Sequence, residues 1–221
     1  AFSGVAKKAE LVIVALKPPS QDVWTSAKGS DFIDAANYIF KYAESVGKPA
    51  VVNLSWGGQM GPHDGTSLFS QAMDSLVGAG KIFVTSGGND GQVNLHLKKE
   101  FTATDTIFHT YVSNVLTHET DNGIWFDIWG QNGNKFDIDI AIIDSATKEV
   151  KFQTGFIKSD KDYLQLTYTT DKDTCGFAIS SESSDYNGRP HVFVHAKTKQ
   201  KFWFKITGKA NTGSIDMWNW Y

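Results

Sequence analysis

The first hundred residues alternate between short apolar runs and stretches of helical periodicity, and this alternation constrains the fold more than any other feature. Three apolar runs have the length of strands: 9–16, 50–54 and 82–84. Between them, apolar residues recur at helical spacing from Ser30-Asp31 to Gly47 and over about 66–77. Apolar strands separated by helices are typical of a parallel sheet with right-handed crossovers. We therefore expect an α/β domain over residues 1–100.

The pattern changes after about residue 100. Short segments of strand character follow one another, several with strict alternation, and turn signals such as Asp121-Asn122-Gly123 separate them. These strand candidates are 106–112, 124–129, 135–143, 163–169, 176–180, 191–196 and 201–207. Many short strands without a helical stretch are typical of an antiparallel β-sandwich, and we expect a jelly roll over residues 101–221. The fold class is thus α/β followed by all-β.

Charge and hydropathy exclude several classes of partner. The 221 residues carry a net charge of −3 without a basic stripe, so we expect no nucleic-acid partner. No apolar run approaches the roughly 18 residues that a membrane span requires. Cys175 is the only cysteine, which excludes an intrachain disulfide and a Cys-based metal site. The chain opens on Ala1-Phe2-Ser3-Gly4, without Met or a signal peptide, which indicates a processed protein or an excised piece.

Two glycine-rich stops follow predicted strands, at 55–58 and 86–89. Parallel strands direct their carboxyl ends to one edge of the sheet, where ligands of such folds bind, so we expect both stops to face one crevice. The second stop places the amide of Asn89 directly after two glycines. An amide in that position can donate a hydrogen bond to a developing oxyanion, although an ordinary strand-to-loop turn would have the same residues.

Three segments resemble those of the subtilases, the subtilisin-like serine proteases. GVAKKAELVIVAL is similar to the segment after the catalytic-histidine helix, VVNLSWGG to the substrate-binding strand, and FVTSGGNDG to the oxyanion-asparagine strand. The resemblance covers residues 4–96 in the family order, and it implies an oxyanion role for Asn89 and no cofactor. It also implies substrate contacts along two segments, Ser55-Trp56-Gly57-Gly58 and Ser86-Gly87-Gly88. Trp56 is bulkier than the Leu or Met that is usual in the family.

The resemblance also implies that most of the catalytic machinery lies outside this chain. The family's Asp and His segments would precede Gly4, and no Gly-Thr-Ser nucleophile segment follows Asn89. Gly65-Thr66-Ser67 mimics such a segment but precedes the oxyanion strand, so we interpret it as a helix cap. His63-Asp64 we interpret as part of an exposed loop. We expect a fragment of a serine endopeptidase that is inactive by itself.

The family likeness has consequences for partners and location. Some subtilases carry a jelly-roll insert between the oxyanion asparagine and the nucleophile segment, and the predicted sandwich occupies that position. The strand that carries the catalytic Asp would lie between those matching 11–16 and 50–54. Its absence would leave a gap or exposed strand edges, which we expect to be closed by rearrangement, by another chain or by self-association. The intact parent would act on peptides or proteins at an extracellular, periplasmic or cell-envelope location.

A rival hypothesis is a pseudoprotease or binding module whose sandwich recognises a glycan or a partner protein. Five tryptophans could build an aromatic platform for sugar, or could be core residues instead: Trp125, Trp129, Trp203, Trp218 and Trp220. Asp137 and Asp139, with Asp127, could bind calcium, but carboxylates on a solvated strand face explain them as well. His191 and His195 share a strand face without an evident third ligand, so we predict no metal site.

Overall fold

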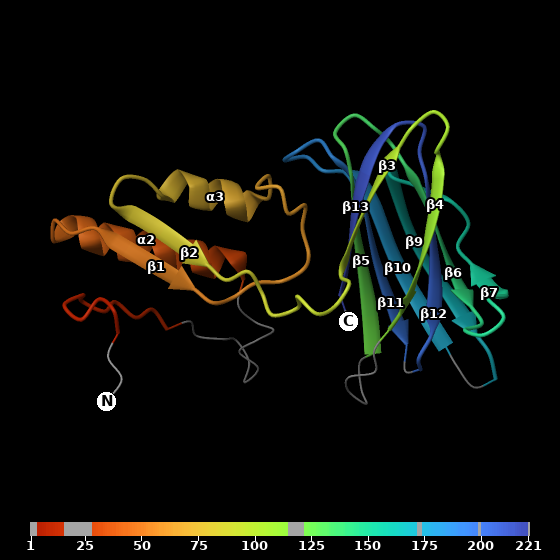
Figure 1. The fold of residues 1–221 in the computed structure, drawn as a ribbon, viewed down its shortest axis with the longest axis horizontal. Helices are drawn as coiled ribbons and strands as arrows, with labels where there is room; N and C mark the ends of the chain where they lie inside the picture. The colour runs from red at the N-terminus through yellow and green to blue at the C-terminus, as the bar shows by residue number, and fades with distance from the viewer. Residues whose placement is uncertain (1–3, 16–27, 115–121, 172–173, 199, 221) are drawn as a thin grey trace. The chain divides into compact units, whose positions relative to one another are not determined.

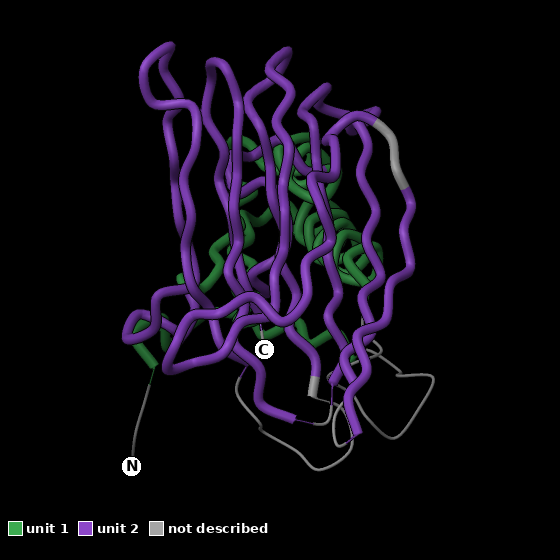
Figure 2. Tube along the Cα trace, turned by 90° about the vertical axis from the view of Figure 1, so that its right-hand side faces the viewer, with its two compact units in different colours: residues 1–57, 68–87 green, residues 58–67, 88–221 purple. Residues whose placement is uncertain are grey.

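A computed structural model describes residues 4–15, 28–114, 122–171, 174–198 and 200–220. The chain forms two compact units that interleave along the sequence (Figure 2). Unit 1 comprises residues 1–57 and 68–87, and unit 2 comprises residues 58–67 and 88–221. Unit 2 therefore contains a ten-residue loop, 58–67, and a strand before residue 100 that the sequence pattern placed in the first domain.

The described residues of unit 1 form two helices and two strands in alternation (Figure 1). Their bounds are α2 Gly29–Ser45, β1 Ala50–Leu54, α3 Leu68–Leu76 and β2 Lys81–Thr85. β1 and β2 pair in parallel, as predicted. Both helices are amphipathic, and residues from all four elements form one small core around Ala36, Phe40, Val52 and Met73. Gly47, with a φ of 64°, follows α2 in the left-handed conformation that glycine tolerates best.

The predicted strand over residues 9–16 is wrong within the described residues. Residues 9–15 have no regular structure, and Leu16 lies outside the described ranges. Leu11 and Ile13 are 86% and 85% exposed, whereas a doubly buried strand would hide them. A strand needs hydrogen-bonding neighbours, and β1 pairs only with β2 among the described elements. Between this segment, α2 and β1 lies a hollow of about 770 Å³.

Unit 2 is a sandwich of two sheets (Figure 1). A six-stranded sheet has the order β3-β13-β5-β11-β10-β9, and a second sheet has the order β4-β12-β6-β7, with β8 also paired to β6. The bounds are β3 His96–Phe101, β4 Ile107–Ser113, β5 Asn122–Gly130, β6 Asp137–Ile143, β7 Val150–Gln153, β8 Ile157–Lys158, β9 Lys161–Thr169, β10 Thr174–Ser183, β11 Pro190–Thr198, β12 Trp203–Lys209 and β13 Gly213–Trp220. All these pairings are antiparallel.

Alternating side chains from both sheets fill the sandwich interior. On β5, Ile124, Phe126 and Ile128 are fully buried, and on β12 Phe204 and Ile206 are fully buried as well. The rings of Phe126 and Phe204, from opposite sheets, lie 5.9 Å apart in an edge contact. The period of two therefore separates a dry inner face from an outer face, as the sequence predicts for these strands.

Four strands of unit 2 have no counterpart among the predicted strands: β3, β7, β8 and β13. β13 is the Trp-rich tail, which joins the six-stranded sheet between β3 and β5. Its inner residues Ile215 and Met217 are buried, and Gly213 begins it with a φ of 85°. Neither described helix is long and apolar enough to cross a membrane.

Candidate active site

The predicted site begins where β1 and β2 end. Their register pairs Leu54 with Thr85, the last residue of each strand. The ladder continues one step further, because the Ser86 N–H donates to the Leu54 carbonyl oxygen at 3.3 Å. Ser55 and Ser86 therefore leave the same edge of one parallel sheet, as expected for residues at the carboxyl ends of its strands.

The other predicted substrate residues follow in two loops. Ser55, Gly57 and Gly58 are exposed, and the partly buried Trp56 ring lies 5.4 Å from the ring of Phe32 on α2. Ser86, Gly87, Gly88 and Asn89 are all exposed, and Gly88 has a φ of 87° that other residues rarely adopt. The division between the two units passes through both loops, between Gly57 and Gly58 and between Gly87 and Gly88.

The neighbouring His63-Asp64 pair and the Gly-Thr-Ser mimic lie in a hydrogen-bonded turn of the loop 58–67. Asp64 accepts hydrogen bonds from the backbone N–H and the hydroxyl of Thr66, at 2.9 and 2.6 Å. His63 Nε2 lies 2.9 Å from the carbonyl oxygen of Gln59, and its ring stacks on Trp218. Asp64 thus closes a turn just before α3, as the side chain of an Asp at the start of such a turn commonly does.

A buried carboxylate that sequence reasoning treated as a solvated one lies on the six-stranded sheet. Asp127 alternates with the core residues Phe126 and Ile128 and so occupies the outer face, yet it is only 2% exposed. The Gly61 N–H donates to its Oδ2 and His191 Nε2 donates to its Oδ1, both at 2.5 Å. Burial raises the pKa of this carboxyl, but the hydrogen bonds from His191 and Gly61 outweigh it and leave the pKa below its ordinary value of 3.8.

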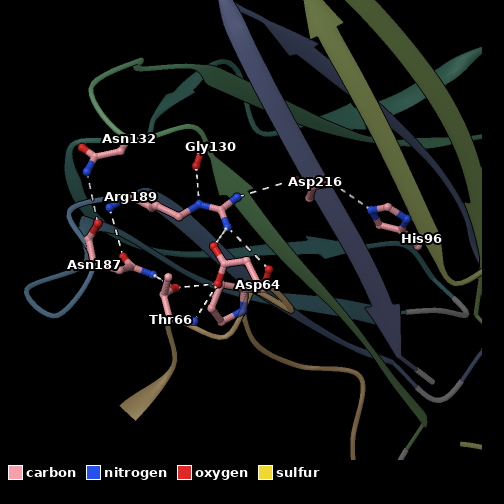
Figure 3. Close-up of polar contacts among 9 residues, drawn as sticks. Asp64, Thr66, His96, Gly130, Asn132, Asn187, Arg189 and Asp216 are labelled. Carbon is pink, nitrogen blue, oxygen red and sulfur yellow. Dashed lines mark hydrogen bonds and ion pairs between the residues drawn. The ribbon is translucent and has the colours of Figure 1, made fainter. Parts of the chain in front are cut away.

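Arg189 joins the same face of the sandwich to the loop 58–67 (Figure 3). Its Nη1 donates to Asp64 Oδ2 at 2.6 Å, its Nε donates to the Gly130 carbonyl at 2.7 Å, and its Nη2 lies 3.5 Å from Asp216 Oδ2. Beside it, Asn187 Nδ2 donates to the Thr66 hydroxyl at 2.9 Å. Burial raises the pKa of Asp64, but hydrogen bonds from Thr66 and Arg189 bring it below 3.8.

Aromatic stacking completes the attachment of the loop. His63 stacks on Trp218 with ring centroids 3.8 Å apart, and His96 stacks on the same indole at 4.0 Å. Two imidazole rings at these distances cannot both stack on the same face of the indole, so the Trp218 ring lies between those of His63 and His96. We call Asp127, Arg189 and Trp218 the loop clamp. Its three residues come from β5, β13 and the turn before β11.

The five predicted platform tryptophans do not share one surface. Trp203 lies on β12 in the second sheet, Trp129 is buried, and Trp218 is stacked between two histidines. Trp125 and Trp220 are paired in register, with His195 opposite Trp125 on its other side. Among the described residues, no three or more His, Cys, Asp or Glu group so that they could hold a metal ion. Asp127 and the pair Asp137 and Asp139 lie on different sheets.

The sequence did not predict the loop clamp, because the residues that form it and those that it contacts are far apart along the chain. Gly61 and Asp127 are separated by 66 residues, and Asp64 and Arg189 by 125. One signal was present in the composition. Arg189 is the only arginine among 21 basic residues, and a planar, five-donor guanidinium is preferred where several acceptors must be held at once.

Comparison with known proteins found a similar fold and a matching family. The solved CspB protease of Clostridium perfringens is similar in fold, with a TM-score of 0.67 at 15% sequence identity. That similarity covers 91% of this chain and 42% of the protease, so this chain spans less than half of that length. No curated protein matches the sequence. The subtilase family matches residues 1–117, more than half of the 221 residues. The chain belongs to the subtilase family.

Proposed function

We propose that this chain is the central part of the catalytic domain of a subtilisin-like serine endopeptidase, with an inserted β-sandwich. The observation that carries the proposal is the parallel pairing of β1 and β2, which delivers Ser55 and Ser86 to one sheet edge in a chain of this family. The exposed backbone of residues 55–58 would pair with an extended substrate as an added strand does. Residues 86–88 would line the pocket for the residue before the scissile bond.

The chemistry of the intact parent would be acyl transfer. A serine activated by a histidine attacks the peptide carbonyl, and negative charge develops on the carbonyl oxygen. The Asn89 amide donates a hydrogen bond to that oxygen, together with a backbone N–H. In this proposal the acid, the base and the nucleophile lie outside residues 1–221, so the chain binds substrate but does not cleave it.

Two further features belong to the proposal. The sandwich is a jelly roll, supported by strand orders β3-β13-β5-β11 and β4-β12-β6-β7 that interleave early and late strands in both sheets. The hollow of about 770 Å³ beside β1 accepts a further strand, from another part of the protein, another chain or a second copy. The location would be extracellular, periplasmic or in the cell envelope, which fractionation of the source cells would test.

Binding of an unfolded protein tests the substrate edge. Fluorescein-labelled β-casein should bind the 221-residue chain in an anisotropy titration, without appearance of fragments. Gly57→Pro removes a backbone N–H from the edge and should weaken binding about tenfold. Gly91→Pro is a matched control, because a Cβ at either glycine would meet nothing within 4 Å. Equal affinity of the two variants, or no binding by the wild type, would refute the proposed edge.

The absence of a nucleophile is tested separately. A fluorophosphonate reagent, which labels activated serines, should leave the chain unlabelled, and Ser67→Ala should change nothing. Asn89→Ala should not alter casein affinity, because the oxyanion forms only in the transition state. In the intact parent the same substitution should lower kcat about 10²- to 10³-fold. Labelling of Ser67 would overturn this part of the proposal.

Binding of glycan by the sandwich is the second candidate function. The row Trp220, Trp125 and His195 across three neighbouring strands favours it, because Trp220 is 37% exposed and Trp125 stacks parallel to His195 at 4.8 Å. A glycan array would test it. Binding that disappears in Trp125→Ala and Trp220→Ala, but persists in Trp203→Ala, would support a sugar platform.

A further inference from the structure

The loop 58–67 connects β1 to α3 of unit 1 but folds as part of unit 2. Its first residue, Gly58, is the last of the four residues Ser55 to Gly58 that resemble the substrate-binding edge. The chain therefore passes from the edge directly into a segment whose position is set by the sandwich. Contacts between this loop and the sandwich therefore act on a segment that is covalently joined to the edge.

Asp127 provides the first attachment, through the loop backbone. A carboxylate at an outer strand position is normally solvated, but the loop and His191 leave this one only 2% exposed. A buried carboxylate needs hydrogen-bond donors, and Gly61 supplies one from its backbone N–H. The loop cannot leave Asp127 without exposing that carboxylate or removing one of its donors, so the contact favours a single loop position.

Arg189 provides the second attachment and holds four groups at once. Its guanidinium contacts the carbonyl oxygens of Gly130 and Pro62 and the carboxylates of Asp64 and Asp216, and its side chain is only 12% exposed (Figure 3). Pro62 and Asp64 belong to the loop, whereas Gly130 and Asp216 belong to β5 and β13. A lysine ammonium, with three donors on a flexible stem, cannot reproduce this planar arrangement.

We propose that Asp127 and Arg189 are positioning residues that hold the substrate-binding edge at Ser55–Gly57 through the loop 58–67. The sandwich then acts as a determinant of peptide binding rather than as a separate module. An edge that is already extended when it meets a peptide loses less conformational entropy on binding, which raises affinity without any new contact. This inference rests on the proposed function, since it assigns a role to the proposed edge.

Amide hydrogen exchange in the 221-residue chain, followed by NMR, tests the positioning directly. Asp127→Asn and Arg189→Lys should accelerate exchange about tenfold at residues 59–66 and also at residues 55–57. Matched controls are Asp137→Asn and Lys209→Met, which break an ion pair at 3.3 Å on the second sheet. The controls should leave exchange at both segments unchanged. Arg189→Lys keeps the charge, so it remains informative if Asp127→Asn does not fold.

Casein binding by the same variants separates this inference from the proposed function. Asp127→Asn and Arg189→Lys should weaken the affinity for fluorescein-labelled β-casein about fivefold, and the controls should not. A purely structural defect would instead lower the number of binding sites and leave the affinity of the folded fraction unchanged. Unchanged exchange at residues 55–57, or unchanged affinity in variants whose loop exchanges faster, overturns the inference. Failure of the wild type to bind casein refutes the proposed function, while exchange at 55–57 still decides whether the clamp holds the edge.

Discussion

The two units of this chain bury apolar residues to very different extents. Among the described residues, the sandwich has a core cluster of twenty buried residues, drawn from both sheets. The described part of the α/β unit has a buried cluster of four residues, and it leaves Leu11, Ile13, Val51 and Leu68 largely exposed. Burial of apolar surface is the main favourable term in folding. The sandwich therefore buries enough apolar surface to fold as an independent unit. The α/β unit instead leaves apolar side chains exposed, which further elements would cover.

The largest effect on stability is expected when an aromatic core ring is removed from each unit in turn. The two substitutions test whether the two cores are independent of each other. Phe204→Ala deletes a fully buried ring that packs near Phe126 and Phe177, and should lower the free energy of unfolding of the sandwich by about 3–5 kcal/mol. Phe40→Ala, in the smaller core of unit 1, should leave the sandwich transition unchanged. Urea titrations followed by near-UV circular dichroism would measure both, and a shift of the sandwich transition by Phe40→Ala would show that the units unfold together.

The loop clamp should make the sandwich sensitive to acid. The pKa of Asp127 is lowered in the folded chain, so its stabilising effect is fully present above the ordinary value of 3.8 and is lost as pH falls through the lower folded pKa. Asp127→Asn should cost about 2 kcal/mol at pH 7, because hydrogen bonds to a charged group are lost. The difference in free energy of unfolding between the wild type and Asp127→Asn should disappear as the pH approaches about 2.

The control for the acid effect is Asp160→Asn, since Asp160 also has a lowered pKa but is an exposed partner of Lys135. Its variant should differ much less from the wild type across the same pH range, because exposed ion pairs contribute little. Urea midpoints at several pH values would compare the two variants. A constant gap between Asp127→Asn and the wild type down to pH 2 would contradict the ionised, hydrogen-bonded carboxylate.

A smaller effect on stability is expected when the single cysteine, Cys175, is replaced. Cys175 is fully buried on β10, and burial raises the pKa of its thiol to about 12, so the thiol is neutral in ordinary buffers. Cys175→Ser changes no charge but introduces a hydroxyl into the core, and should cost about 1–2 kcal/mol. Thermal unfolding of this variant beside Cys175→Ala would measure it. If serine proves no worse than alanine, the interior must offer the hydroxyl a partner.

The smallest effect on stability, but a visible effect on association, is expected in the N-terminal segment. Leu11→Thr with Ile13→Thr should change the free energy of unfolding by no more than about 0.5 kcal/mol, because both side chains are exposed. The same change should reduce self-association through the hollow beside β1, as measured by sedimentation velocity. Tyr163→Thr, at an exposed position of the sandwich, is the control. If the wild type, the double variant and Tyr163→Thr sediment identically, the chain does not self-associate through the hollow.

Local pattern predicted much of this fold. The strand predicted at 50–54 and the apolar face of α2 were read from residues whose neighbours in sequence are also their neighbours in structure. Alternation along β6 likewise separated the buried Ile138, Ile140 and Ile142 from Asp137 and Asp139. The segment 9–15 was misread for the opposite reason. An apolar run indicates a strand only when a neighbouring strand is there to accept its hydrogen bonds.

The sequence by itself determined the α/β-then-β order, the family and the glycine-rich strand ends, because periodicity and short motifs are local properties of the chain. Tertiary structure alone decided that Asp127 is buried and that Arg189 joins the loop 58–67 to two strands. Alternation shows which face of a strand is outward, but it does not show what covers that face. The covering groups come from 66 and 125 residues away, and only folding brings them together.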